Sequence, residues 1–472
     1  MIDILFVNPP SPNDDIYIRD ICRVGRKSRE NMIWPQTSLA QLAAMVYPKF
    51  KVGIIDCIAE NIKWDKFEEY LKKNKPKYYI THVTAPTLTN DMYGVKIAKK
   101  FGAITISIGT HSNAVIKDTL IKFPSLDFII IGEPELTLKE LIETLDKKKS
   151  VAKIKGIAYK KNNKIKINPE RPFIKNLDDL PIPIYKLLPL NKYRMPIIGK
   201  KYVWLLSNRG CPNSCTFCIQ KSMWKGTVRH KSPERILKEI KVLHNLGVNN
   251  ILFQSDLFTQ NREMVIKLCK LIVNSGLKVR WACNSRVDTL NEEMLYWMKK
   301  AGCFMIALGI ESCNQQILNN VKKGITIEQI KNAVRIINNA GIKVWGYFII
   351  GLPGETWDTV KETVNIAKKL KMELTLWHIA VPYAGTEFNR QAKKNKWLIN
   401  ENWEEFDMNE STAISYPHMS AKEIIKATKW AYMQWYARPS VIIQLAKYAI
   451  NPYNIRYFIK NMIKHIIWTN KK

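Results

Sequence analysis

Residues 203–218 decide the fold, and they read Val203-Trp204-Leu205-Leu206-Ser207-Asn208-Arg209-Gly210-Cys211-Pro212-Asn213-Ser214-Cys215-Thr216-Phe217-Cys218. A short apolar run leads into three cysteines with the spacing C-x3-C-x2-C. Three thiolates can bind three irons of a cubane [4Fe-4S] cluster, whose usual full set is four cysteines. The fourth iron is then open to a small molecule. An open iron indicates chemistry at the cluster rather than a structural role.

Two other interpretations of Cys211, Cys215 and Cys218 stay open at this point. Free cysteines are often simply small apolar core residues. A structural zinc site usually takes four ligands, arranged as pairs in the sequence, and no second pair of suitable spacing is present. We therefore interpret the three cysteines as ligands of an iron–sulfur cluster.

The composition indicates an intracellular protein of more than one domain. The 472 residues allow two or three domains, and 46% of them are hydrophobic. Nine cysteines, an odd number without a regular framework, argue against a secreted disulfide protein. The N-terminus lacks the pattern of a signal peptide. No apolar stretch reaches the roughly 18 residues that a membrane span needs.

The chain is strongly basic, with a formal net charge of +33. Such a charge indicates anionic surroundings, which could be nucleic acid, anionic lipid or a phosphorylated substrate. A lysine-rich bias of the whole proteome is the alternative. From Ile424 to Lys472 there is no Asp or Glu, whereas there are nine Lys or Arg.

Residues 1–150 are expected to form an N-terminal Rossmann-like domain. Short apolar runs alternate with amphipathic segments, which is typical of a parallel sheet with crossover helices, either Rossmann-like or flavodoxin-like. Ligands of such sheets bind at the carboxyl ends of the strands. The expected strands are 4–8, 51–56, 78–83, 103–109 and 128–132, and the expected helices are 38–46, 64–74, 91–101, 113–123 and 136–146.

A second alternating series occupies residues 198–390. Before it, residues 151–197 predict a hairpin and a proline-rich linker, in which Pro181 and Pro183 restrict the backbone. Six strand–helix units predict a partial (β/α)6 barrel. The cysteines follow its first strand, at the face where barrel enzymes place their chemistry. The expected strands are 203–207, 250–254, 278–283, 305–309, 343–349 and 373–379.

Residues 391–472 are expected to form a helical tail. After Pro452, a row of Arg456, Lys460 and Lys464 lies opposite an apolar stripe, which predicts a basic amphipathic helix. The stripe consists of Ile455, Phe458, Ile459, Met462, Ile463, Ile466 and Ile467.

The order of these parts resembles radical S-adenosylmethionine (SAM) enzymes with an N-terminal cobalamin-binding-type domain. In that family SAM chelates the open iron and is cleaved to a 5'-deoxyadenosyl radical. One branch is especially similar: the enzymes that form the cyclitol ether of bacteriohopane polyols, together with archaeal calditol synthase. The stretches that carry the resemblance are 6–10, 34–35, 39–41, 211–218, 311–319, 346–355 and 381–386.

This resemblance implies that the enzyme converts a lipid-linked hexose head group to a cyclopentane polyol by radical ring contraction. The expected partners are then a lipid-linked sugar, an anionic membrane surface bound by the basic tail, and an electron donor such as ferredoxin or flavodoxin. The expected location is the cytoplasm, peripheral at the inner membrane surface. The alternative is a cobalamin-dependent radical SAM C-methyltransferase acting on a lipid or another unactivated carbon.

The resemblance places SAM among residues at the strand ends of the barrel. Phe217 would pack against the cluster or the adenine, and Asp256 would meet the SAM amino group. An arginine can hold a carboxylate in a bidentate pair, so Arg286, close to Asn284, would hold the SAM carboxylate. Glu311 would bond the ribose hydroxyls of SAM or the substrate. Residue Gly351 would turn the chain near the adenine, and for each residue an ordinary turn, packing or surface role is the alternative.

Cobalamin would lie against two loops of the first domain. These loops carry Gly109 and His111 after the fourth strand, and Gly132 and Glu133 after the fifth. The cobalt-ligating motif D-x-H-x-x-G is absent, so cobalamin binding rests on analogy between domains. The alternative for His111 is a buried histidine with ordinary hydrogen bonds.

A tRNA methylthiotransferase, which the basic charge suggests, fits the sequence poorly. That family carries a second cluster with three further cysteines in its N-terminal domain, whereas here that domain offers only Cys22 and Cys57. We therefore expect no nucleic-acid partner. A basic membrane-binding protein with a purely structural cluster is the other alternative, and the SAM-type loops argue against it.

Overall fold

The computed structural model describes residues 2–21, 24–162 and 164–449. The chain divides into two compact units. The first contains the described residues up to Lys27, together with Ile33–Arg194 and Arg229–Lys231. The second contains Ser28–Met32, Met195–Val228 and the described residues from Ser232 onward. Both units are α/β, as the sequence predicts.

The sheet of the first unit has seven strands in the order β4-β1-β5-β6-β7-β8-β9. The first five are parallel, whereas β8 runs antiparallel to β7 and to β9. In chain order the parallel strands are arranged 2-1-3-4-5, which is the flavodoxin-like order. The predicted hairpin therefore extends this sheet. The strands are β1 (Ile4–Asn8), β4 (Val52–Asp56), β5 (Tyr78–His82), β6 (Ile104–Ile108), β7 (Phe128–Ile130), β8 (Ile157–Lys161) and β9 (Lys164–Ile167).

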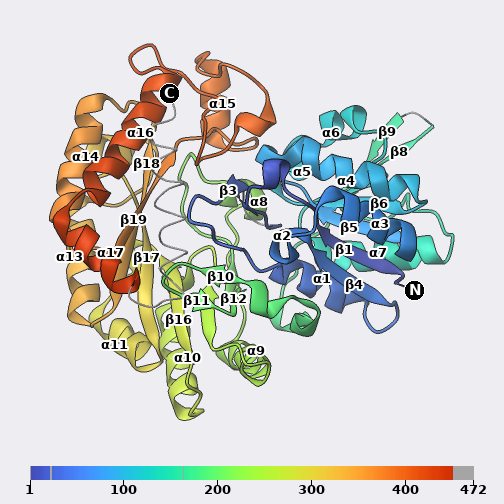
Figure 1. The fold of residues 1–472 in the computed structure, drawn as a ribbon, viewed down its shortest axis with the longest axis horizontal. Coiled ribbons are helices and arrows are strands. Elements are labelled where there is room, and N and C mark those ends of the chain that lie inside the picture. The colour runs from blue at the N-terminus through green and yellow to red at the C-terminus, as the bar shows by residue number, and fades with distance from the viewer. Residues whose placement is uncertain (1, 22–23, 163, 450–472) are drawn as a thin grey trace. The chain divides into compact units, whose positions relative to one another are not determined.

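Helices cover both faces of this sheet (Figure 1). On one face α1 and α7 pack against alternate strand residues, among them Phe6, Ile80 and Ile106. On the other face α4 approaches so closely that a Cβ on Gly94 would lie 2.7 Å from the Tyr79 hydroxyl. The helices are α1 (Thr37–Val46), α2 (Cys57–Glu60), α3 (Trp64–Asn74), α4 (Leu88–Lys100), α5 (Thr110–Ala114), α6 (Ile116–Lys122) and α7 (Pro134–Asp146).

The second unit contains a six-stranded sheet whose strands are all parallel and follow one another in chain order. This is the open, partial barrel that the sequence predicts. Its strands are largely buried, which explains their nearly continuous apolar sequences. The strands are β12 (Tyr202–Leu205), β15 (Asn250–Phe253), β16 (Arg280–Ser285), β17 (Cys303–Glu311), β18 (Lys343–Ile350) and β19 (Leu374–Ile379).

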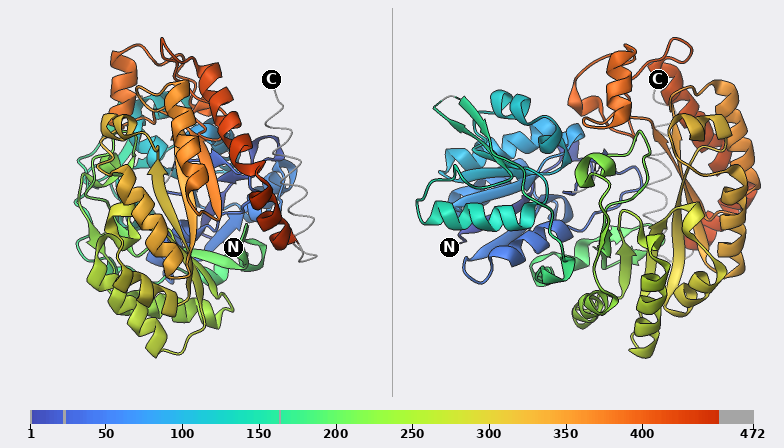
Figure 2. Two further views of the ribbon diagram at one scale, coloured as in Figure 1. Left: turned by 90° about the vertical axis from the view of Figure 1, so that its left-hand side faces the viewer. Right: turned by 180° about the vertical axis from the view of Figure 1, so that it is seen from behind.

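The helices between these strands form the outer layer of the partial barrel (Figures 1 and 2). Most begin at a polar cap: Thr326 and Thr356 form capping boxes, and Asn261 accepts from the Met264 N–H. The helices are α9 (Pro233–Asn245), α10 (Arg262–Asn274), α11 (Glu292–Lys300), α12 (Gln315–Asn320), α13 (Ile327–Asn339) and α14 (Trp357–Lys369).

The C-terminal segment is less separate from the barrel than the sequence suggests. Helix α16 buries Ile424 and Trp435, contacts β19 and α14, and places the Tyr436 hydroxyl 2.7 Å from the Thr375 carbonyl oxygen. Residues 395–420 contain only one short 3-10 helix (Trp403–Glu405) and isolated bridges. The helices of this segment are α15 (Glu387–Lys394), α16 (Ala421–Tyr436) and α17 (Pro439–Ala449).

Several further 3-10 helices and short elements lie between the long ones. The short strands and helix are β2 (Tyr17–Ile18), β3 (Arg26–Lys27), β10 (Arg194–Met195), β11 (Gly199–Lys200), β13 (Asn208–Arg209), β14 (Arg229–His230) and α8 (Gln220–Trp224). Within the described ranges no helix is long and apolar enough to cross a membrane. The predicted basic amphipathic helix after Pro452 lies outside the described residues.

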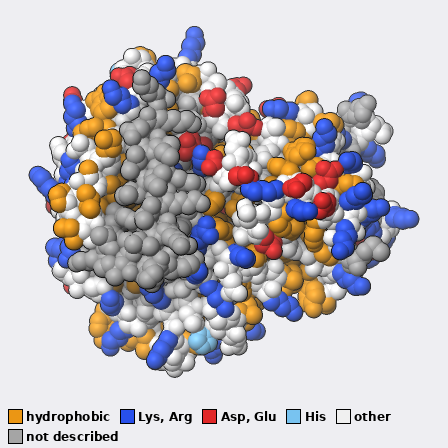
Figure 3. All heavy atoms as spheres, in the orientation of Figure 1, with side chains coloured by type: hydrophobic (Ala, Val, Ile, Leu, Met, Phe, Trp, Pro, Cys, Tyr) orange, Lys and Arg blue, Asp and Glu red, His pale blue; other side chains and the backbone are white. Residues whose placement is uncertain are grey.

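Positive side chains are spread over the face drawn in Figure 3. Lys and Arg are distributed across the described part of this face, with Asp and Glu and apolar side chains among them. The chain has 74 Lys and Arg against 41 Asp and Glu, and on this face the basic side chains do not form one continuous patch.

Candidate functional site

The three cysteines lie in a loop at the carboxyl end of the sheet in the second unit. Backbone bonds hold this loop at several points. The Gly210 N–H donates to Asp256 Oδ2 (2.6 Å), the Thr216 N–H donates to the Val321 carbonyl (3.0 Å), and the Thr216 carbonyl accepts from the Phe388 N–H (2.9 Å). The loop is therefore anchored to three other segments of the same unit.

The thiols differ in exposure and in their contacts. Cys215 is buried, whereas Cys211 and Cys218 are half-buried. Cys211 Sγ accepts a hydrogen bond from Asn213 Nδ2 (3.3 Å). Desolvation raises the pKa of Cys215 and raises that of Cys218 to about 12. Both thiols are thus protonated in the protein alone, and a metal must displace these protons when it binds.

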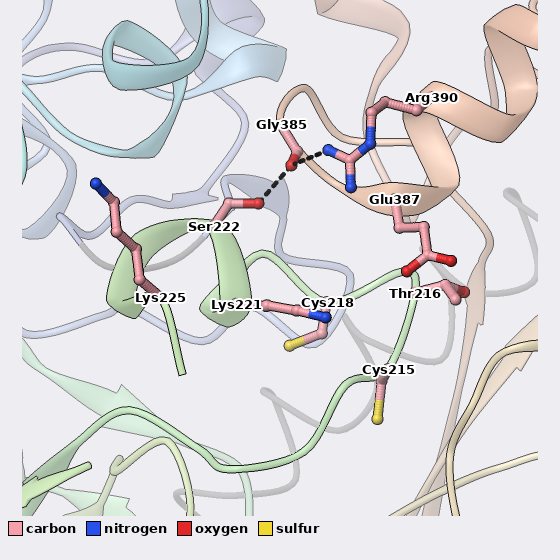
Figure 4. A pocket seen from close by; sticks show the side chains of 9 residues that line it. All are labelled: Cys215, Thr216, Cys218, Lys221, Ser222, Lys225, Gly385, Glu387 and Arg390. Atoms are coloured by element: carbon pink, nitrogen blue, oxygen red, sulfur yellow. Dashed lines mark hydrogen bonds between the residues drawn. The ribbon is translucent and has the colours of Figure 1, made fainter. Parts of the chain in front are cut away.

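No three Cys, His, Asp or Glu side chains of the described residues are grouped as metal ligands. In Figure 4 the side chains of Cys215 and Cys218 point in different directions from the loop. The donor set nevertheless suits an iron–sulfur cluster, since all three are thiols on one loop at the carboxyl end of a parallel sheet. Their assignment rests on this chemistry, their spacing and their position.

Arg286 lies beside the cysteine loop, immediately after β16. Its guanidinium forms a bidentate pair with Asp288 (2.9 and 2.8 Å), and Nη2 also donates to the Lys323 carbonyl (2.9 Å). Its Nη1 lies 3.9 Å from Cys215 Sγ. The sequence predicted a partner for the SAM carboxylate. In the structure two of the nitrogens of Arg286 are already bonded to Asp288, which fixes the side chain next to the thiol.

A buried ion pair completes the charged cluster. Lys323 Nζ lies 2.8 Å from Glu311 Oε1, with side-chain exposures of only 6% and 11%. Burial alone would lower the pKa of Lys323, but Glu311, chiefly through its negative charge, raises that pKa above its ordinary value. Glu311 has φ = 67°, a left-handed conformation that is strained for a residue with a side chain. In this conformation the Glu311 carboxylate, at the end of β17, lies beside the lysine.

A glycine leaves room for this ion pair. A Cβ on Gly309 would lie 2.7 Å from Glu311 Oε1 and 3.1 Å from Lys323 Nζ. The structure thus brings Cys215, Arg286 and Glu311 into one region and adds Lys323 to them. Sequence reasoning missed Lys323 because nothing distinguishes it from the many other lysines of the chain.

Other predicted SAM residues lie around the same edge of the sheet. Asp256 accepts the Gly210 N–H, so its carboxylate supports the cysteine loop from the side. Asn284 is half-buried near the end of β16, and Phe217 is half-buried within the loop. Ser255 was given no role, yet its hydroxyl lies 2.6 Å from that of Ser207 and accepts the Ser207 N–H.

Gly351 forms a tight turn directly after β18, with φ = 93°. The buried Glu355 carboxylate accepts the N–H groups of Gly351 and Leu352 through Oε2, whereas Oε1 has no hydrogen-bond partner among the described residues. Burial raises the pKa of Glu355 to about 8, against the two bonds from backbone N–H groups, which lower it. Glu355 is the last residue of the stretch 346–355, which carries part of the family resemblance. Sequence reasoning therefore had this residue in view but assigned a role only to Gly351.

In the first unit, the predicted cobalamin loops lie side by side after β6 and β7. Asn113 joins them: its Oδ1 accepts the Gly132 N–H (2.9 Å), and its Nδ2 donates to the Gly109 carbonyl (2.8 Å). Gly109 approaches β5 so closely that a Cβ would lie 2.9 Å from the Val83 carbonyl oxygen. His111 is buried, and burial lowers its pKa to about 4.

Glu133 is engaged within the first unit. Its carboxylate oxygens lie 2.8 Å from Arg229 Nη1, and Oε2 accepts the Ile174 N–H (2.6 Å). This carboxylate therefore fastens the loop after β7 to two other segments. The direct role toward a corrin that the sequence suggested for Glu133 is less suited to a side chain bonded in this way.

The topological switch point between β1 and β5 contains a buried polar network. Asn8 donates to Asp56 (2.7 Å), and Arg19 donates to Asn8 (3.1 Å) and lies 3.4 Å from Asp91. His82, at the end of β5, is fully buried, and neither ring nitrogen bonds to a described residue. Burial and the nearby Arg19 lower the pKa of His82 to about 3, so its imidazole is neutral.

Residues 205–367 match the family model of the Radical SAM superfamily. The chain is 36% identical over 415 residues to the uncharacterized methyltransferase PH0819 of Pyrococcus horikoshii, an alignment that covers 87% of this chain and 89% of that protein. This match spans far more than the barrel alone.

Two solved structures share the fold. The radical SAM methyltransferase TsrM from Kitasatospora setae, with cobalamin and a [4Fe-4S] cluster bound, matches 84% of this chain and 75% of its own with a TM-score of 0.68 and 16% identity. The cobalamin-dependent radical enzyme OxsB, with aqua-cobalamin and SAM bound, matches 99% of this chain and 72% of its own with a TM-score of 0.71 and 17% identity. Both likenesses extend beyond the barrel.

Proposed function

The chain belongs to the radical SAM superfamily, and on that premise we propose that it is a cobalamin-dependent methyltransferase acting on an unactivated carbon. It is an enzyme whose cofactors are a [4Fe-4S] cluster and SAM. The observation that carries the proposal is the combination of units: a cysteine-bearing partial barrel follows a sheet of flavodoxin-like order. The likeness to PH0819, which is named a methyltransferase, supports it.

The charged cluster of the barrel suits the binding of SAM beside the three thiols. When bound, the cluster and SAM supply a radical that removes hydrogen from carbon, and cobalamin supplies a carried methyl group. Cys211, Cys215 and Cys218 would hold the cluster. Arg286 and Lys323 put two positive charges next to Cys215, where they favour thiolate over thiol. Glu311 would accept hydrogen bonds from SAM.

Cobalamin would lie on the first unit, against the loops that Asn113 joins. Gly132 has no described atom within 4 Å of its Cβ position, so its backbone is open to a large ring, whereas Gly109 lets its loop close against Val83. His111 would offer a neutral imidazole at neutral pH because burial lowers its pKa to about 4. Glu133 would hold the loop in place through Arg229 rather than touch the corrin.

A second candidate function is ring contraction of a lipid-linked hexose, which the enzyme would carry out at an anionic membrane surface. The stretches 311–319, 346–355 and 381–386, which resemble cyclitol-ether-forming enzymes and calditol synthase, support it. The acid-free sequence from Ile424 onward is compatible with an anionic surface. We prefer methyl transfer to ring contraction because the similarity to PH0819, which is named a methyltransferase, extends over 415 residues.

The proposal is tested by reconstituting the protein with iron, sulfide and hydroxocobalamin under anaerobic conditions. We expect about one cobalamin to stay bound through gel filtration, and SAM with a reductant to yield 5'-deoxyadenosine. Absence of bound cobalamin would contradict the methyltransferase but leave the ring contraction. Absence of SAM cleavage with any substrate or extract would contradict both.

A further inference from the structure

A cavity of about 290 Å³ borders the cysteine loop within the second unit (Figure 4). Cys215, Thr216 and Cys218 form one side of it. The other sides come from the region of α8 and from the start of α15, and the nine lining residues are those labelled in Figure 4. Two of the three cluster ligands are therefore reached from this side.

The rim of this cavity is positively charged. Lys221, Lys225 and Arg390 are exposed and line it, and the one acidic lining residue is Glu387. Glu387 Oε1 lies 2.7 Å from Lys322 Nζ, a lysine that is itself 57% exposed. The carboxylate of Glu387 is thus paired with a lysine that does not line the cavity, and cationic side chains outnumber acidic ones in the lining.

The rim is also held in a fixed arrangement. The Gly385 carbonyl accepts from Ser222 Oγ (2.5 Å) and from Arg390 Nη1 (3.2 Å), which ties α8 to the segment before α15. The Thr216 carbonyl accepts the Phe388 N–H (2.9 Å), which ties the cysteine loop to α15. This surface therefore needs no rearrangement before a partner protein binds.

We propose that this basic rim, Lys221, Lys225 and Arg390 around the cavity beside Cys215 and Cys218, is the docking surface for a small acidic one-electron carrier protein. In each encounter the carrier loses one electron and the cluster gains it, with no bond formed or broken. Opposite charges speed such encounters, and electron-transfer interfaces are typically small and transient. The cavity admits acidic side chains of the carrier close to the cluster ligands.

The test measures reduction of the reconstituted cluster by its visible absorbance, with reduced flavodoxin as the probe, at low and high sodium chloride. The variant K221E/R390E is compared with K238E/K241E, which makes the same charge change on the exposed outer face of α9. We expect K221E/R390E to lower the second-order rate constant at least ~10-fold and to lose most of its salt dependence, whereas K238E/K241E stays close to the unmodified protein.

Photoexcited deazaflavin, a small uncharged reductant, provides the internal control. It should reduce the cluster of K221E/R390E as fast as that of the unmodified protein. An unchanged flavodoxin rate in K221E/R390E would overturn the proposal, and so would an equal loss with both reductants, which would place the residues in cluster binding itself. Because absorbance of the cluster is the readout, the result does not depend on whether the enzyme transfers a methyl group.

Discussion

At the scale of single residues, burial decides the protonation of Glu355. Its carboxyl is fully buried behind the turn after β18, and its pKa rises to about 8 from an ordinary 4.5. Between these two pH values the unfolded chain has lost the proton, whereas the folded chain keeps it. Folding is therefore most stabilised by this group below pH 4.5, and that contribution is lost as the pH rises toward 8.

Glu355→Gln should flatten this pH dependence. The amide keeps an acceptor for the N–H groups of Gly351 and Leu352 but does not titrate. We expect the difference in unfolding free energy between variant and parent to grow by up to about 1.4 kcal/mol per pH unit between pH 5 and 8, in favour of the variant. Urea titrations at several pH values measure it, and a difference independent of pH would contradict the assignment. Glu355→Ala, which leaves both N–H groups unbonded, should instead destabilise by about 1–3 kcal/mol.

Because Glu311 and Lys323 form a buried ion pair, a substitution of one residue should reduce stability much more than a substitution of both. Lys323→Met leaves a buried carboxylate without its partner and should cost about 3–5 kcal/mol of stability. Adding Glu311→Gln removes the unpaired charge, so the double variant should recover much of that loss. A double variant no more stable than Lys323→Met, measured by thermal unfolding, would show that the two side chains do not depend on each other.

The sequence identified residue positions better than residue partners. Cys215, Arg286 and Glu311 do meet at one place, because each follows a strand of the same parallel sheet. Asp256 and Glu133 were assigned to ligands, yet each bonds neighbouring protein groups. The direction of a side chain in a loop depends on distant contacts, which a single sequence does not contain.

At the scale of elements, the cysteine loop depends on Gly210. A Cβ there would lie 1.7 Å from the Thr227 carbonyl oxygen, and the residue has φ = +93°. Gly210→Ala should therefore displace the loop and sharply reduce the iron bound after reconstitution. Gly276→Ala is the matched control, because Gly276 also has a positive φ of +68° but no atom of the described part of the chain within 4 Å of its Cβ position. The control should cost about 1 kcal/mol and keep the cluster. Equal iron content in both variants would contradict this role.

Strands were predictable to within a few residues because buried parallel strands are short apolar runs. The strand order of the first sheet was not predictable, since the alternating pattern of strands and helices fits both Rossmann-like and flavodoxin-like arrangements. The attachment of α16 to β19 was also missed. Its apolar positions looked like those of a tail helix, and only tertiary contacts show that they cover the last strand of the barrel.

At the scale of the whole molecule, we expect the two units to hold separate cofactors. Replacing Cys211, Cys215 and Cys218 together by Ala should abolish the bound iron and SAM cleavage. Cobalamin, which we place on the first unit, should still be retained through gel filtration in about the same amount as in the unmodified protein. Loss of cobalamin from a variant that remains folded by circular dichroism would contradict this division.

The central claim is methyl transfer, and SAM labelled in its methyl carbon tests it most directly. The reconstituted protein, with cobalamin and a reductant, is added to extracts of cells that lack its gene, and the lipid and polar fractions are analysed for label. We predict enzyme-dependent label in one product, together with both S-adenosylhomocysteine and 5'-deoxyadenosine. Formation of 5'-deoxyadenosine with a new, unlabelled product would contradict methyl transfer and favour ring contraction.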